Sequence, residues 1–286
     1  MNSIITKYLS ALIMSLAFTT GSGVLAVGQE EAEQTGEVVL LPEQSDIGIP
    51  EEAFELANNL YLEGKFEDAI LVYEQIVSSG YHSPELYYNL GNAWYRSNRI
   101  SHAILNYERA ALLSPGDEDI RFNLELARSH LRDRIEELPG FFLNRWWNGT
   151  RDIMSYRGWA MISISAFTGM LVLLAIFLMV SSTAAKKVSF WLATLMLLVS
   201  ALTFSLGLDQ RNHIKNYNGA IVFVQSVPVK SSPDVNSTDL FIIHEGTKVR
   251  VEEAIGDWYS VRLSDGNKGW LRQETVEMIY PAAEDL

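Results

Sequence analysis

Two asparagines that lie 34 residues apart, Asn58 and Asn92, are each followed three residues later by a tyrosine, Tyr61 and Tyr95. A side-chain amide donates and accepts hydrogen bonds at once, so amides at a fixed spacing can hold the backbone of an extended peptide. The neighbouring rings can cover the side chains of such a peptide. These residue types predict the binding of a protein segment rather than a covalent reaction.

Residues that usually carry catalysis or bind metals are scarce and scattered. The chain has no cysteine, which excludes disulfides, Cys-ligated zinc and thiol catalysis. Its five histidines are scattered along the chain without a second ligand at helical or hairpin spacing, and the sequence has neither a glycine-rich phosphate loop nor a Gly-x-Ser-x-Gly motif. We therefore expect no enzymatic activity, no catalytic residues, no metal and no cofactor.

The net charge of −13 comes from 22 Lys and Arg against 35 Asp and Glu. Residues 51–137 carry eight basic and sixteen acidic residues, a net charge of −8. A protein that binds duplex nucleic acid needs a basic surface that releases counterions from the phosphates. The acidic chain therefore argues against nucleic-acid partners, and the acidic segment favours a partner that carries Lys or Arg.

A self-similarity at an offset of 34 residues runs through 50–117. Pro50 aligns with Pro84, Ala69-Ile70 with Ala103-Ile104, and Tyr73 with Tyr107. Together with Leu90-Gly91 and Pro115, this spacing of large and small residues resembles the tetratricopeptide repeat, a helix-turn-helix unit. The resemblance implies an all-α domain at 51–137, with repeats at 50–83 and 84–117 and a capping helix at 118–137.

By this resemblance the first helix of each repeat lines a concave groove. The implied protein-binding positions are Phe54, Asn58, Tyr61, Leu62, Tyr88, Asn92, Tyr95 and Arg96. Asn58 and Asn92 occupy the same repeat position and stand outside the set that packs the helices. The alternative is that these side chains are merely exposed polar residues on a scaffold that meets its partner by another face.

The first 50 residues predict export. Lys7 precedes an apolar run of signal-peptide length, and Val24-Leu25-Ala26 places small residues at a cleavage site, which indicates a signal peptide at 1–26. An uncleaved anchor is the alternative. Residues 27–50 carry six acids and no Lys or Arg, a composition that predicts a disordered linker.

Two uncharged apolar runs, 159–180 and 188–208, are each long enough to cross a bilayer. They predict two transmembrane helices joined by a short turn. Because the export signal sends the preceding residues outward, we expect Lys186 and Lys187 of the turn inside the cytoplasm and both soluble domains outside. The aromatic and Arg-containing segment at 138–157 is typical of the headgroup layer and predicts an interfacial stretch.

Residues 218–280 alternate as short strands do and predict a small all-β barrel. The runs Val227-Pro228-Val229, His244-Glu245-Gly246 and Gly269-Trp270-Leu271 resemble a bacterial SH3 domain. Trp258 and Trp270 can fill the core of so small a barrel. Alternatively, Tyr259 and Trp270 line a peptide or glycan groove.

The chain therefore predicts a multidomain membrane protein of tetratricopeptide repeats, two transmembrane helices and an SH3-like barrel. This order of parts resembles BatE-type proteins, the tetratricopeptide components of the Bacteroides aerotolerance operon. The resemblance implies a non-enzymatic scaffold of the bacterial inner membrane that faces the periplasm. It also implies membrane partners of the von Willebrand type and a MoxR-type ATPase, in a complex linked to oxidative stress. The alternative is an envelope sensor whose SH3-like domain binds peptidoglycan.

Overall fold

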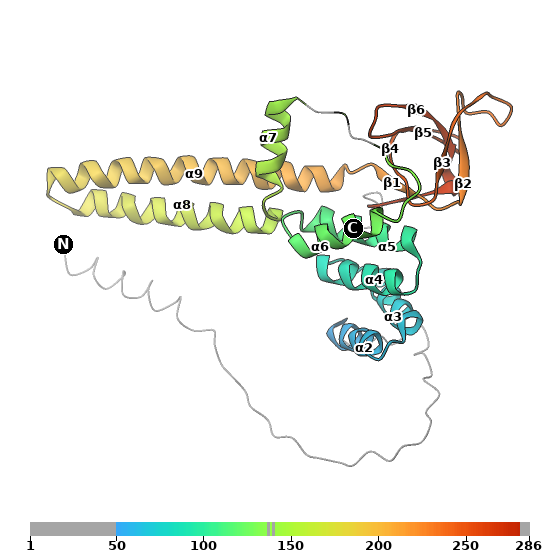
Figure 1. Ribbon diagram of the computed structural model, residues 1–286. Coiled ribbons are helices and arrows are strands. Elements are labelled where there is room, and N and C mark those ends of the chain that lie inside the picture. The colour runs from blue at the N-terminus through green and yellow to red at the C-terminus, as the bar shows by residue number, and fades with distance from the viewer. Residues whose placement is uncertain (1–49, 136–137, 139–140, 281–286) are drawn as a thin grey trace, which may run out of the picture. The chain divides into compact units, whose positions relative to one another are not determined.

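The computed structural model of the chain describes residues 50–135, 138 and 141–280 (Figure 1). The predicted signal peptide at 1–26 lies outside the described residues. The acidic segment at 27–50 lies outside them as well, except for its last residue.

Five consecutive helices form the N-terminal part of the described chain, which we call the repeat domain. They are α2 (Pro50–Leu62), α3 (Phe66–Ser78), α4 (Pro84–Arg96), α5 (Ile100–Leu113) and α6 (Glu118–Arg128). Ser83 caps α4 by accepting a hydrogen bond from the backbone N–H of Leu86 at 3.1 Å, and Pro84 takes the first helical position. Asp117 caps α6 in the same way. The caps fix the helix starts where the 34-residue pattern predicts them.

Helices α4 and α5 cross as closely as that pattern predicts. Gly91 and Ala103 are both buried, and Ala103 has no exposed surface. A Cβ atom at Gly91 would lie 2.7 Å from the ring of Tyr107, closer than side-chain carbons approach one another. Only glycine lets this ring lie against α4, so the predicted burial of Gly91 and Ala103 at the crossing of the two helices is confirmed.

Helix α6 is shorter than the predicted capping helix at 118–137: it ends at Arg128, and the prediction is wrong for residues 129–135. The backbone N–H of Ser129 still donates to Glu125, but the helix has ended. Four residues later, the carboxylate of Asp133 accepts hydrogen bonds from the backbone N–H of His244 at 2.7 Å and the hydroxyl of Thr247 at 2.8 Å. This carboxylate therefore ties the segment after the helix to the C-terminal domain.

Three helices follow: α7 (Phe142–Arg151), α8 (Tyr156–Met179) and α9 (Thr183–Lys215). Helices α8 and α9 lie side by side and antiparallel (Figure 1). Both are long and apolar enough to cross a membrane. Only 11% of the most apolar 18-residue stretch of α8, and 22% of that of α9, is buried inside the structure. Ser163 and Ser200 tie them together, since each hydroxyl donates to the backbone carbonyl of the other residue at 3.0 Å. Helix α9 continues past the predicted span at 188–208 for two further turns.

The C-terminal strands form one antiparallel sheet, which we call the sheet domain, in the order β3-β2-β6-β5-β4-β1-β7. The strands are β1 (Gly219–Val222), β2 (Ser226–Lys230), β3 (Asp239–His244), β4 (Lys248–Ile255), β5 (Trp258–Arg262), β6 (Lys268–Arg272) and β7 (Val276–Met278), with a 3-10 turn at Gln273–Thr275. Val229, Val249, Val261 and Leu271 are buried at its core. Because side chains alternate along a strand, the neighbours of these core residues point to the opposite, outer face.

Candidate functional site

Four of the eight predicted groove residues line one hollow of the repeat domain. Asn58, Tyr61, Leu62 and Asn92 surround a pocket of about 240 Å³, together with Tyr73 and Asn89. Leu62 is 80% exposed at its edge. The structure therefore brings the first helices of both repeats to a common concave surface, as the repeat pattern implies.

The two predicted amides also tie the repeats together. The Oδ1 atom of Asn58 accepts hydrogen bonds from the phenol of Tyr73 at 2.6 Å and from the amide of Asn89 at 3.0 Å. The Oδ1 atom of Asn92 accepts from the equivalent Tyr107 at 2.7 Å and from the amide of Asn123 at 3.0 Å.

We call these contacts the amide network. Burial raises the pKa of both phenols, so they stay protonated donors. The expectation that Asn58 and Asn92 stand outside the packing set is wrong, because both side-chain oxygens carry contacts within or between repeats.

The remaining predicted residues lie beside this network. The hydroxyl of Tyr88 accepts from Asn123 at 2.9 Å, and the ring of Tyr95 meets that of His130 edge-on. The guanidinium of Arg96 lies 4.8 Å from the centre of the Phe66 ring. Phe54 lines a separate hollow of about 320 Å³ between α2 and the start of α4.

Two exposed apolar residues on α6 extend the groove positions. Phe122 and Leu126 are 66% and 40% exposed, and they lie 34 residues after Tyr88 and Asn92. Neither residue is among the predicted groove positions. Adding the 34-residue offset to Tyr88 and Asn92 identifies both residues, because α6 follows α4 at the same spacing at which α4 follows α2.

The second helix of the second repeat, α5, is covered by the sheet domain. Ile104 of α5 packs in one buried cluster with Ile221 of β1 and with Ile279, just after β7. The guanidinium of Arg109 donates to the backbone carbonyl of Ile279 at 2.9 Å. This face of the repeats is therefore occupied by the chain itself.

A buried carboxylate lies at this junction. Glu108 of α5 pairs with Lys248 of β4 at 2.8 Å and with Arg128 of α6. Burial alone would raise the pKa of Glu108, but the two cations more than offset that effect and hold its pKa below the usual value. Two positive charges thus share one negative charge, and the carboxylate stays ionised.

The sheet domain does not bring the second predicted site together. Tyr259 lies opposite the buried Leu271 and packs against the core, whereas Trp270 lies opposite Ser260. The two rings therefore project from opposite faces of the sheet. Trp270 shares the outer face with Trp258. The guanidinium of Arg272 lies over the Trp258 ring, at 5.7 Å from the ring centre. Neither tryptophan belongs to the buried core of the sheet domain, so the expectation that Trp258 and Trp270 fill that core is wrong.

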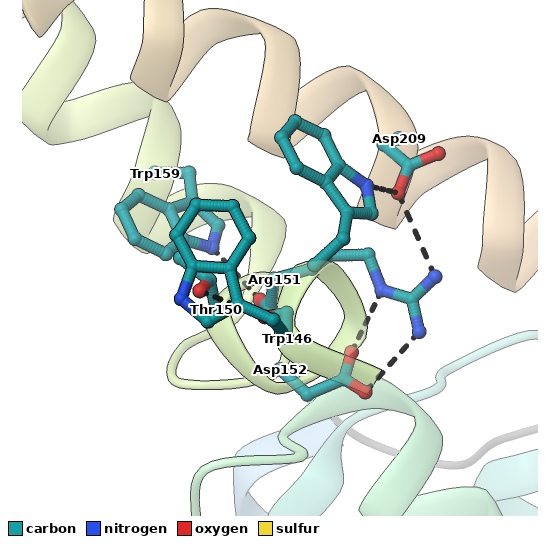
Figure 2. Close-up of polar contacts among 7 residues, drawn as sticks. Trp146, Thr150, Arg151, Asp152, Trp159 and Asp209 are labelled. Carbon is teal, nitrogen blue, oxygen red and sulfur yellow. Dashed lines mark hydrogen bonds and ion pairs between the residues drawn. The ribbon is translucent and has the colours of Figure 1, made fainter. Parts of the chain in front are cut away.

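Helix α7 is bound to the C-terminal part of α9 (Figure 2). The indole of Trp147 donates to Asp209 at 3.0 Å, and the buried guanidinium of Arg151 lies 3.6 Å from the same carboxylate and 2.8 Å from Asp152. The indole of Trp159 on α8 donates to the backbone carbonyl of Arg151 at 2.9 Å. These bonds connect three helices at the point where the apolar run of α9 ends.

Among residues 50–135, 138 and 141–280, no group of three His, Asp or Glu side chains could hold a metal ion.

Residues 84–117 match the tetratricopeptide repeat family, and residues 225–277 match the bacterial SH3 domain family. Each match covers less than half of the chain, so the matches identify two domains and confirm both domain resemblances.

A solved structure of the type III secretion chaperone SycD from Yersinia enterocolitica, in complex with a peptide of the translocator YopD, resembles the chain at 18% identity. The likeness covers 53% of this chain and 92% of the chaperone, with a TM-score of 0.27, too distant to argue from. No curated protein matches the chain.

Proposed function

We propose that the chain is a non-enzymatic membrane scaffold that holds a segment of a protein partner in the groove of its repeat domain. The observation that carries the proposal is the asymmetry of the repeats. The face formed by α5 is covered by the sheet domain, whereas the face formed by α2, α4 and α6 keeps an open pocket and exposed apolar side chains. Exposed apolar groups that line a concave surface favour a protein partner.

The groove suits an extended segment with basic residues. Leu62 and Phe122 offer apolar contact, and Tyr61, Tyr88 and Tyr95 offer rings with a polar tip. The amide oxygens of Asn58 and Asn92 are used within the chain, so the recognition we propose depends chiefly on rings and apolar contacts. Because the net charge of 51–137 is −8, binding weakens as salt concentration rises.

We further propose that α8 and α9 cross the bacterial inner membrane as a hairpin with both domains in the periplasm. The most apolar stretches of both helices are largely exposed, which supports contact with lipid rather than with a protein core. Phe141, Phe142 and Trp146, all more than half exposed, suit the headgroup layer beside them. A reporter that is active only in the cytoplasm, fused after Leu286, should be silent, and strong activity would overturn this topology.

The groove is tested by site-specific crosslinking in native membranes. A photoreactive residue at Leu62 or at Phe122 should capture a protein partner. The matched control is Leu71 of α3, which is 49% exposed but lies outside the groove positions. Equal capture from Leu71, or capture from Trp270 of the sheet domain alone, would contradict the groove assignment.

A double substitution measures how much the exposed apolar side chains of the groove contribute to binding of the partner. Leu62→Ser with Phe122→Ser should lower recovery of the captured partner about tenfold or more, since burying a leucine or phenylalanine contributes about 1.5–3 kcal/mol. Leu71→Ser should leave recovery unchanged. Recovery of the partner at the wild-type level by the double variant would show that it binds elsewhere.

The finer role that we propose is membership of an aerotolerance complex with von Willebrand-type membrane partners and a MoxR-type ATPase, as the resemblance to BatE-type proteins implies. Its test is the identity of the captured protein. A second candidate function, binding of peptidoglycan, is favoured by the outward tryptophans Trp258 and Trp270. If it holds, the full chain sediments with purified cell wall and loses this property in Trp270→Ala but not in the groove double variant.

A further inference from the structure

Basic side chains form a row across three neighbouring strands of the sheet domain. Arg250 of β4 lies directly opposite Arg262 of β5, and Arg262 lies directly opposite Lys268 of β6. Directly opposite residues project to the same face, and like charges placed this way destabilise a sheet. Lys248 lies two residues before Arg250 and therefore projects to the same outer face.

The carboxylates near this row do not balance it. Glu252 is shared by Arg262 and by Lys268, whose ammonium lies 2.6 Å away. Glu108 is likewise shared by Lys248 and Arg128. Within the described residues, the side chain of Arg250 makes no ion pair and no hydrogen bond.

The excess is more notable because residues 218–286 as a whole carry six basic and eleven acidic residues. Four of the six basic residues gather at this place. The local charge thus opposes the charge of the domain.

A pocket opens beside these cations. It has a volume of about 540 Å³ and lies between the end of α9, the start of β1 and the strands β4 and β5. Lys248, Arg250 and Arg262 line it, together with polar groups from His213, Asn218 and Ser264. Among the described residues, no Asp or Glu contributes to the lining. The volume falls within the range of about 300–1,000 Å³ that is typical of small-molecule sites.

We propose that this pocket binds a phosphate-bearing anion, held by Arg250, Arg262 and Lys248. Guanidinium groups bind phosphate oxygens through paired, charge-assisted hydrogen bonds, and a lysine adds a point charge. The amide of Asn218 and the hydroxyl of Ser264 can donate to or accept from the remainder of the ligand. Such an anion would neutralise the excess positive charge that the row of cations leaves.

The position of the pocket is compatible with two sources of the phosphate group. His213 lies five residues after Leu208, the last residue of the predicted span, or about 7–8 Å further along the helix. The headgroup layer extends about 5–7 Å beyond the hydrocarbon core on each side. The phosphate can therefore belong to the headgroup of an anionic lipid or to a soluble phosphate ester.

The experiment uses the full chain in nanodiscs. In the soluble arm, glycerol 3-phosphate is titrated calorimetrically into protein held in phosphatidylcholine nanodiscs. In the lipid arm, native mass spectrometry measures how much phosphatidylglycerol remains bound to protein released from mixed discs. The lipid arm rests on the proposed membrane hairpin, whereas the soluble arm does not, and neither arm depends on a partner in the groove.

Arg250→Gln is the decisive variant, because Arg250 holds no other group of the described chain. It should weaken binding about 10- to 100-fold in whichever arm shows it, as expected for the loss of a charge-assisted contact. Arg272→Gln is the control: it removes the same charge from the outer face but lies outside the pocket lining. Binding in either arm that is lost only in Arg250→Gln supports the site and identifies the source. Absence of binding in both arms, or equal losses in the two variants, would overturn the proposal.

Discussion

The repeat domain and the sheet domain arrange their polar side chains in opposite ways. In the repeat domain, the oxygens of Asn58 and Asn92 each accept two hydrogen bonds from the chain itself. In the sheet domain, Arg250 has no partner among the described residues, and Glu252 is shared by two cations. The repeat network is satisfied internally, whereas the row of cations is left with excess charge.

This difference separates structural polar residues from those available to a ligand. A polar residue that recurs with the repeat period suggests a binding site. In this chain the asparagines recur because each accepts hydrogen bonds that hold adjacent helices together. A cluster whose charges do not balance costs stability without a ligand. An imbalance of charge is therefore the better sign of a site than a periodic polar residue.

The largest effect is expected at Glu108, where the two domains meet. Glu108→Gln leaves Lys248 and Arg128 without their common carboxylate. Breaking a fully buried pair costs about 3–5 kcal/mol, and the cost here is lower because water solvates the two cations, whose side chains are 34% and 39% exposed. The full chain in detergent should show a correspondingly lower free energy of unfolding in denaturant titrations. Glu118→Gln, whose carboxylate is exposed, should change little.

The stability difference between wild type and Glu108→Gln should depend on pH. The pKa of Glu108 is lowered in the folded state, so its contribution is fully present above the unfolded pKa of about 4.3. That contribution is lost as the pH falls through the lower, folded pKa. The difference in stability between wild type and Glu108→Gln should stay constant from about pH 6 to pH 8 and shrink below about pH 4. A difference that grows on acidification would contradict the ionised carboxylate.

The next effect concerns the packing that the repeat pattern predicts. Ala103 has no exposed surface, so Ala103→Leu adds atoms where none fit and should destabilise the fold by about 1–3 kcal/mol. Thermal unfolding followed by tryptophan fluorescence measures the change. Ala254→Leu, at an exposed position of β4, is the control. An unchanged midpoint for Ala103→Leu would show that the repeat register is wrong.

The amide network is tested by a double-mutant cycle. Asn92→Ala removes the acceptor of the Tyr107 phenol and should cost about 1–3 kcal/mol, because a buried donor loses its partner. Tyr107→Phe in the Asn92→Ala background should cost less than in the wild type. Additive losses would show that the two residues do not interact, and the contrast between the domains would then fail for the repeats.

The sequence correctly predicted the burial of Gly91 and Ala103 but misjudged the role of the repeat asparagines. The comparison at an offset of 34 residues aligns equivalent positions, and burial of Gly91 and Ala103 follows from that alignment. The contacts from Asn58 to Asn89 and from Asn92 to Asn123 span 31 residues instead. They join different positions of adjacent first helices, so a search for equivalent residues cannot reveal them.

The sheet domain shows a similar limit. Alternating apolar residues identify central strands, but β2 contains Pro228, which disfavours a strand, and β7 has only three residues. The row from Arg250 to Arg262 to Lys268 depends on the register of three strands and on a bulge between Val251 and Glu253. Local composition does not fix that register. The pocket therefore becomes visible only in the folded chain.

The smallest expected effect is on stability at Arg250, and its sign is informative. If Arg250 were a structural residue, Arg250→Gln would destabilise the sheet. Because it faces Arg262 and holds no other group of the described chain, its loss should instead leave stability unchanged or raise it by about 0.2–0.5 kcal/mol in low salt. Added salt screens the repulsion and should reduce the gain. Denaturant titrations of the full chain at low and high salt, with Arg272→Gln alongside, measure both quantities. A clear loss of stability in Arg250→Gln alone would show that the chain uses this cation internally, and the contrast with the satisfied amides of the repeats would no longer hold.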